Sequence, residues 1–209
     1  MNMRPKSKPG FSLVEMVVVL GVIVMILSLT LTSFPKLRNQ IAVTLATRQM
    51  ALAIRQAQSY AISVRDFNST FAKTICNSPN PPNPPARYPP YGVHLMTAVP
   101  DTFIVFGDIT CSSPPAYNSG NVPSEIVSQT YMQNGTKISA LTGYVGAVMT
   151  NLNRIDIVYQ RPTPSVTIVG YPVAGGNFSY NKITITISSA DNTINKIITV
   201  GASGQVSLQ

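Results

Sequence analysis

Charged residues and histidine are scarce in this chain, and their scarcity excludes several classes of protein. Only 11% of the 209 residues are charged, whereas a typical soluble domain has about 25%. One histidine and seven acidic residues leave little for an enzyme built on histidine clusters or carboxylates, and a thiolate zinc site needs more than the two cysteines present. A highly charged disordered chain is also excluded, because 44% of the residues are hydrophobic.

Among the few charged residues, positive charge dominates. Fifteen Lys and Arg stand against seven Asp and Glu, which gives a formal net charge of +8 and a pI near 9.7. Such an excess points to a nucleic acid or an anionic membrane as a partner. The length suits one ordinary domain with an appendage, or one large all-β unit.

The N-terminus joins a short basic head to a long apolar run. Arg4, Lys6 and Lys8 precede 24 residues, 11–34, that carry a single charge. As a helix this run is roughly 36 Å long and can cross a hydrocarbon core of about 30 Å. The positive-inside rule keeps the basic head in the cytoplasm. The run exceeds the usual length of a signal-peptide core, and no clean small-x-small cleavage site follows it, so we expect a membrane anchor.

The single charge in the run, Glu15, is what a plain anchor does not explain. A carboxylate in an apolar helix costs about 2.5 kcal/mol or more for insertion, and less near the interface. No Lys or Arg lies within the next 20 residues. A cut between Gly10 and Phe11 would create an α-amino group four residues before Glu15. That amine could pair with Glu15 of the same chain or of a neighbour.

The segment Lys-Pro-Gly-Phe-Ser-Leu-Val-Glu, residues 8–15, and the apolar run after it resemble the processing motif of type IV prepilins. The resemblance implies that a prepilin peptidase cuts after Gly10 and N-methylates Phe11. It also implies that Glu15 pairs with the amine of an adjacent subunit during assembly. The precursor would then be a single-pass inner-membrane protein, and residues 1–10 would be its cleaved leader.

An amphipathic helix is expected after the anchor, within residues 35–66. Pro35 should kink the helix near residues 31–34, because proline lacks an amide donor and crowds the preceding turn. Over residues 36–65, apolar residues recur at helical spacing and form the face that we expect to pack on a sheet. They are Leu37, Ile41, Leu45, Leu52, Ala53, Tyr60 and Val64.

Basic residues populate the rest of this helix, and no acid occurs between Glu15 and Asp66. Arg48 and Arg55 are seven residues apart and share a face. The simpler interpretation is a solvated polar face. The alternative is a contact for polyanions such as DNA or lipid headgroups, for which two aligned arginines are a small footprint because tight DNA binding uses many phosphate contacts.

A proline-rich loop is expected within residues 79–90, where seven prolines exclude a helix or a central strand. Cys76 and Cys111 bracket it. The expected topology puts both outside the cytoplasm, where disulfides persist. We therefore predict a Cys76–Cys111 bridge, worth roughly 3–4 kcal/mol on the chain-entropy model. The alternative is a pair of reduced cysteines without a role.

Residues 67–209 otherwise read as a β-rich head of seven or more antiparallel strands, possibly in two packed sheets. The fold class is thus α+β, a long N-terminal helix packed on an antiparallel sheet as in the type IV pilin-like fold. The expected strands are Tyr91–Val99, Thr102–Ile109, Ile126–Met132, Thr136–Leu141, Tyr144–Thr150, Arg154–Gln160, Ser165–Val169, Lys182–Ser188, Ile194–Val200 and Gln205–Leu208. The first two form a hairpin that turns at Pro100 and Asp101.

Three stretches are similar to the GspH/FimT group of minor pilins and pseudopilins: residues 48–61, the pair Tyr-Gly-Val and Phe-Ile-Val-Phe, and residues 198–208. This resemblance implies a filament subunit at or near the tip of a type IV pilus or a type II secretion pseudopilus. Its partners would be the prepilin peptidase, other subunits and the inner membrane. The alternatives from the same residues are a DNA-binding minor pilin for DNA uptake, a pilus adhesin that uses the proline-rich loop, and an anchored domain that is never processed.

Residues for catalysis or for a cofactor are not apparent. His94 has no acid or cysteine near it in the sequence, and the acids are scattered singly, without the spacing of a calcium loop. Gly175-Gly176 lacks the lysine and helix of a phosphate loop. We therefore expect no enzymatic activity, no metal and no cofactor.

Overall fold

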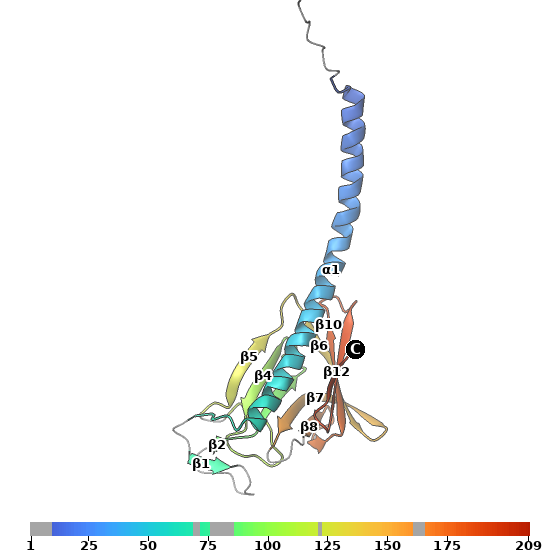
Figure 1. Cartoon of the computed structure of the whole chain (residues 1–209). Coiled ribbons are helices and arrows are strands. Elements are labelled where there is room, and N and C mark those ends of the chain that lie inside the picture. Colours follow the sequence, from blue (N-terminus) through green and yellow to red (C-terminus); the bar gives the residue numbers. More distant parts are fainter. Residues whose placement is uncertain (1–9, 69–71, 76–85, 121–122, 161–165) are drawn as a thin grey trace, which may run out of the picture. The chain divides into compact units, whose positions relative to one another are not determined.

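A computed structural model of the chain describes residues 10–68, 72–75, 86–120, 123–160 and 166–209. One helix, α1 (Leu13–Ile62), begins the structure and strands follow it (Figure 1). The chain divides into two compact units, one ending at Arg38 and one covering Asn39–Gln209. Helix α1 contributes to both units, and each unit is described by itself below.

The first unit holds the apolar part of α1. The helix begins after Ser12, whose carbonyl oxygen accepts a hydrogen bond of 3.2 Å from the amide of Met16. Two hydroxyls inside the apolar run bond back to the helix itself: Ser28 Oγ donates to the Met25 carbonyl and Thr30 Oγ to the Leu27 carbonyl. These bonds satisfy polar groups that an apolar environment would otherwise penalise. The helix continues through Pro35 and ends only at Ile62.

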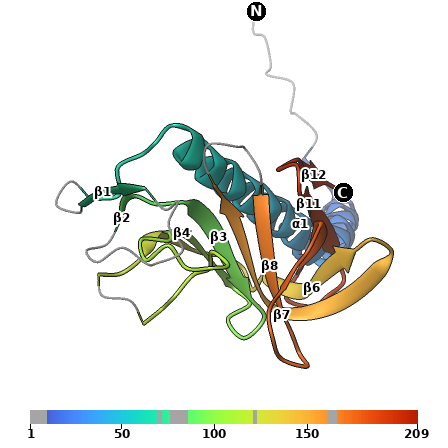
Figure 2. The same ribbon diagram turned by 90° about the horizontal axis from the view of Figure 1, so that it is seen from below.

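The second unit is built on one curled antiparallel sheet of ten strands, not on two packed sheets (Figure 2). Its main path has the order β12-β11-β10-β6-β7-β3-β4-β5, while β8 pairs with β7 and β9 pairs with β8. The strands are β3 (Tyr91–Met96), β4 (Thr102–Gly107), β5 (Ile126–Tyr131), β6 (Lys137–Val145), β7 (Val148–Tyr159), β8 (Val166–Pro172), β9 (Phe178–Ser179), β10 (Lys182–Ser188), β11 (Asn195–Gly201) and β12 (Val206–Leu208).

Most of the expected strands are present, and the errors have local causes. The hairpin at Pro100 and Asp101 is confirmed as β3 and β4. The strand expected over Tyr144–Thr150 is wrong, because the chain turns there between β6 and β7. Gly146 occupies that turn with a φ of +60°, a conformation that favours glycine. Two short strands that were not expected, β1 (Ala72–Ile75) and β2 (Ala86–Tyr88), form a separate parallel pair. Most of the proline-rich loop lies outside the described residues.

The core lies between α1 and the concave face of the sheet, as Figure 2 shows. From β10 the residues Ile183, Ile185 and Ile187 are all fully buried, as their alternation predicted, while the threonines between them are half-exposed. Position 92 on β3 requires glycine, because main-chain and ring atoms of neighbouring strands approach its Cα closely. A Cβ there would lie 2.7 Å from the carbonyl oxygen of Ile157 and 2.9 Å from the Phe106 ring.

The face of α1 that meets this sheet is only in small part the face expected from the sequence. Of the expected residues, Ala53 is buried and Tyr60 packs against the core. The other five are exposed: Leu37, Ile41, Leu45, Leu52 and Val64. The buried face is instead formed mainly by alanines, with three larger residues among them: Ala42, Val43, Ala46, Met50, Ala53, Ile54, Ala57 and Ala61. Small side chains let the helix axis approach the sheet closely, and the sheet's isoleucines and tyrosines fill the space between them.

Candidate functional site

The expected processing and assembly residues lie within six residues of one another around the start of α1. Gly10 and Phe11 precede the helix and are exposed, with 79% of Phe11 accessible. Glu15 lies in the first turn, where a carboxylate interacts favourably with the positive end of the helix dipole. The leader residues 1–9 lie outside the described residues. Gly10–Phe11 is thus an accessible peptide bond next to a helix terminus, with a carboxylate one turn away.

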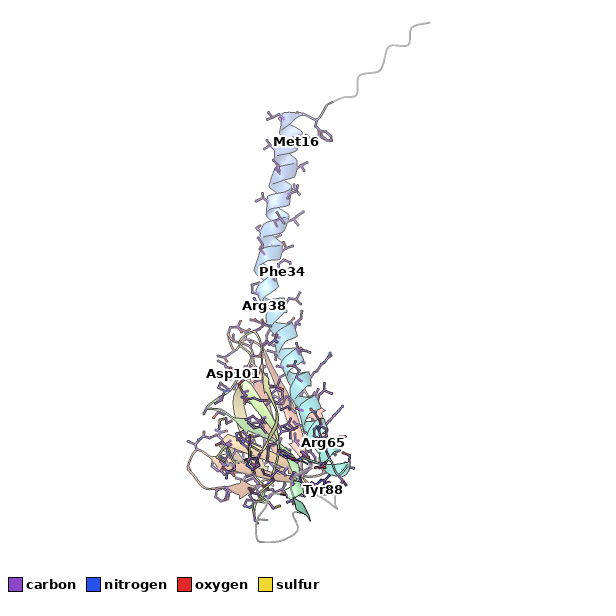
Figure 3. All side chains as sticks on the ribbon, turned by 90° about the vertical axis from the view of Figure 1, so that its left-hand side faces the viewer. Met16, Phe34, Arg38, Arg65, Tyr88 and Asp101 are labelled. Atoms are coloured by element: carbon purple, nitrogen blue, oxygen red, sulfur yellow. The ribbon has the colours of Figure 1, made fainter. Side chains whose placement is uncertain are left out.

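The helix that follows Glu15 is apolar on every side. In Figure 3 the side chains that are drawn between Met16 and Phe34 project around the whole circumference of the helix. Its length and composition allow it to cross a membrane, which makes α1 a candidate membrane anchor or signal segment. A helix that is apolar all round is typical of a segment surrounded by lipid or by other apolar helices.

Arg48 and Arg55, the candidate polyanion contact, are both exposed on the outer face of α1, away from the sheet. Ile41, Leu45 and Leu52 share that outer face and are 60%, 47% and 62% accessible. The outer face of α1 in the second unit, defined here by these five residues, therefore combines apolar and positively charged side chains. The expectation that this apolar stripe packs on the sheet was wrong, whereas the two arginines do share a face.

Cys111 takes part in a disulfide. Cys76, its expected partner, lies outside the described residues. Cys111 begins a loop between β4 and β5 that is tied down at both ends by buried acids. Asp108 accepts hydrogen bonds from the amide and the hydroxyl of Ser112 at 3.1 and 2.9 Å. Its burial raises the pKa of Asp108. Glu125, also buried, accepts from the Asn118 amide at 2.8 Å.

His94 has a partner that the sequence did not indicate. Its Nδ1 lies 2.6 Å from Asp156 Oδ1, because β3 and β7 are paired with His94 opposite Asp156. Both side chains are buried, and Arg154 Nε lies 3.6 Å from the other carboxylate oxygen. The Tyr117 ring covers His94, with 4.7 Å between the ring centroids. His94 is therefore a buried strand histidine whose ring nitrogen has a partner inside the sheet.

These polar groups do not assemble into a recognisable catalytic or metal centre in the part of the chain that is described. No group of three or more His, Cys, Asp or Glu side chains there has a geometry that could hold a metal ion. The buried acids Asp108 and Glu125 are anchored to loop amides and hydroxyls, and Asp156 is engaged by His94. The contacts of Asp108 and Glu125 are local, whereas His94 and Asp156 are 62 residues apart and are brought together only by folding.

Comparisons with known proteins gave no match to a protein-family model, to a curated protein or to a solved structure. The functional argument therefore rests on the chain's own residues.

Proposed function

We propose that the chain is a structural subunit of a type IV pilus-like filament, either a minor pilin or a type II secretion pseudopilin. In this proposal a prepilin peptidase cuts between Gly10 and Phe11 and methylates the new amine. The subunit waits in the inner membrane with its N-terminus in the cytoplasm and its β head outside. It has no enzymatic activity of its own and acts by assembly with other subunits.

The observation that carries the proposal is the motif of Gly10, Phe11 and Glu15 at the start of an apolar helix. Phe11 is exposed and Glu15 lies one helical turn further on. A helix that is apolar on all sides can move from lipid into a bundle of like helices with little change in environment. Within that bundle an unpaired carboxylate would be costly, so pairing of Glu15 with a neighbour's amine would set the axial register.

The outer face of α1 gives this proposal a second support. Ile41, Leu45 and Leu52 are large apolar residues that the sheet leaves uncovered. Exposed apolar residues aligned on one helix face are more typical of a protein contact than of a solvated surface. The proposal assigns this face to contacts with neighbouring subunits, which continue the contacts of the apolar run.

The test is mass analysis of the N-terminus after expression with and without an active prepilin peptidase. The expected product with the peptidase starts at methylated Phe11, and without the peptidase the chain keeps its leader. As a matched control, Gly10→Val should block the cut while leaving membrane insertion unchanged. An uncut chain in the presence of a peptidase that processes a reference prepilin would refute the proposal.

One observation favours a second function, DNA capture by such a subunit. Arg48 and Arg55 are exposed on one face of α1, and the buried Asp108, Glu125 and Asp156 leave the exterior of the head more positive than the sequence suggests. A gel-shift titration of the head at low and high salt tests it. Loss of binding in an Arg48→Gln, Arg55→Gln double variant supports this function, and no shift at low salt excludes it.

A further inference from the structure

The five residues of the outer face of α1 have the spacing by which one helix packs along another. Ile41, Leu45, Arg48, Leu52 and Arg55 follow one another at alternating steps of four and three residues. At about 100° per residue they lie within roughly 80° of the helix circumference. A narrow stripe with this alternation is the seam of a coiled-coil contact. All five residues are exposed, and Figure 1 shows this part of α1 in front of the sheet.

The position of the arginines favours a helix over a lipid surface as the occupant of this stripe. A helix that lies on a membrane has a broad apolar face and carries its basic residues on the polar face. Here Arg48 stands between Leu45 and Leu52 on the same line, and Arg55 follows one turn later. Polar residues at seam positions determine which partner helix is accepted, at a cost in stability. The stripe thus combines apolar area with charges that select a partner.

A second copy of this chain does not supply what the arginines need. In the described part of the chain neither Arg48 nor Arg55 has a carboxylate partner, since the ion pairs there use other cations. No acid occurs between Glu15 and Asp66, and Asp66 already accepts a hydrogen bond from Arg87 Nε at 2.7 Å. A parallel copy of α1 in register would place arginine against arginine, which disfavours self-pairing.

A hollow at the end of the stripe offers further donors to an acidic partner. It has a volume of about 320 Å³ and is lined by Arg55, Gln58, Ser59, Ile62 and Ser63. The Arg55 guanidinium, the Gln58 amide and the Ser59 hydroxyl can all donate hydrogen bonds, and an ionised carboxylate only accepts them. The hollow therefore suits the carboxylate of a glutamate or aspartate on the partner helix.

We propose that the outer face of α1 pairs with a helix of a different subunit, which carries apolar residues along its seam and carboxylates opposite Arg48 and Arg55. This inference rests on the proposed function, because it names the kind of neighbour that a filament subunit meets on this face. Charge complementarity selects the occupant. An acidic seam forms charge-assisted hydrogen bonds with both arginines, whereas a copy of this chain repels them.

A charge-swapped form of the chain itself supplies a matched acidic seam for the test. A full-length Leu45→Cys chain is coexpressed with a differently tagged Leu45→Cys, Arg48→Glu, Arg55→Glu chain, and both are oxidised in membranes. Facing seam positions bring the two Cα atoms within the roughly 7 Å that a disulfide needs. We expect the mixed dimer to exceed either self-dimer by about fivefold or more, because only the mixed pair joins opposite charges. Ser203→Cys, at an exposed turn near β12, gives the background.

A matched control separates pairing along the stripe from general attraction between charges. A Leu45→Cys, Arg65→Glu, Lys182→Glu chain has the same net charge as the swapped chain, but its changes lie off the stripe. Its mixture with the Leu45→Cys chain should therefore show no excess of mixed dimer. Retained protease resistance of the head in every variant confirms that the head is folded. An equal excess in this control would overturn the proposal.

The remaining outcomes identify a different occupant. A Leu45→Cys self-dimer as strong as the mixed dimer would make a second copy the partner. A gel shift with DNA that depends on Arg48 and Arg55, with the mixed dimer at background, would assign both arginines to nucleic acid. Either result, or no band above background, overturns the proposal. All chains are expressed without a prepilin peptidase, so the outcome does not depend on the cut after Gly10 and is distinguishable from a failure of the proposed function.

Discussion

Asp191 lies in the turn between β10 and β11, and its carboxylate collects hydrogen bonds from three neighbours. Ser189 Oγ donates at 2.5 Å, the Thr193 amide and hydroxyl at 3.1 and 2.8 Å, and Asn39 Nδ2 at 3.0 Å. The Ser189 hydroxyl, followed by the Thr193 groups, lowers the pKa of Asp191 to about 2. The ionised carboxylate of Asp191 thus links the turn of the sheet to Asn39 of the helix.

A pH dependence of stability follows from that lowered pKa. The native state holds the Asp191 proton more weakly than the unfolded chain, so ionised Asp191 stabilises the fold above its ordinary pKa. That contribution should be lost as the pH falls through about 2. Carboxyl NMR of the head across this range measures it, and an ordinary midpoint near 3.8 would contradict it. Asp191→Asn should flatten the dependence, because an amide side chain does not titrate.

At the scale of the element, the buried and exposed faces of α1 should respond differently to substitution. Ala57 is fully buried against the sheet and Leu52 is 62% accessible. Ala57→Leu should destabilise the head by about 1–3 kcal/mol, because a packed interface has no room for three more carbons. Leu52→Ala should change the free energy of unfolding by less than about 0.5 kcal/mol. Urea unfolding followed by tyrosine fluorescence measures both, and the reverse ranking would place the sheet on the other face.

The error about this helix has a physical origin. Large apolar residues at helical spacing are the usual signal of a buried face, and Ile41, Leu45 and Leu52 supply it. The face that is buried uses mainly alanines, Ala42, Ala46, Ala53, Ala57 and Ala61, of which only Ala53 was among the expected residues. Alanine recurring at steps of four and seven was visible in the sequence, but alanine alone does not distinguish a close contact from good helix propensity.

Strands were easier to predict than side-chain partners. The β10 alternation of isoleucine and threonine fixes which side is buried, because side chains alternate between faces of a sheet. The His94–Asp156 pair was not predictable, since it depends on the register of β3 against β7 across 62 residues of sequence. The candidate site was the reverse case. Gly10, Phe11 and Glu15 lie within six residues of sequence, so a local motif sufficed to select them as candidates.

For the whole molecule, the net charge alone does not describe the charge that a partner would meet. Three of the fifteen basic residues precede Gly10, so removal of the leader would leave the side chains at a net +5. The acids Asp108, Glu125 and Asp156 are buried, so they contribute little to the field outside the head. The N-terminal bases suit an orienting role in the membrane, whereas the exposed arginines of α1 are what a soluble polyanion would meet.

The role proposed for Glu15 lies between subunits of the proposed filament, so its test is made at the scale of the assembly. Glu15→Ala removes a carboxylate whose insertion costs about 2.5 kcal/mol or more at the centre of a membrane, so the precursor should insert at least as well as before. The filament, however, would lose the charge that pairs with a neighbour's amine. We expect normal membrane fractionation and normal cleavage, but a reduction in filament incorporation of tenfold or more in shear fractions. Glu15→Asp, which keeps the charge, should retain part of the incorporation. Full incorporation of Glu15→Ala would show that Glu15 does not set the register.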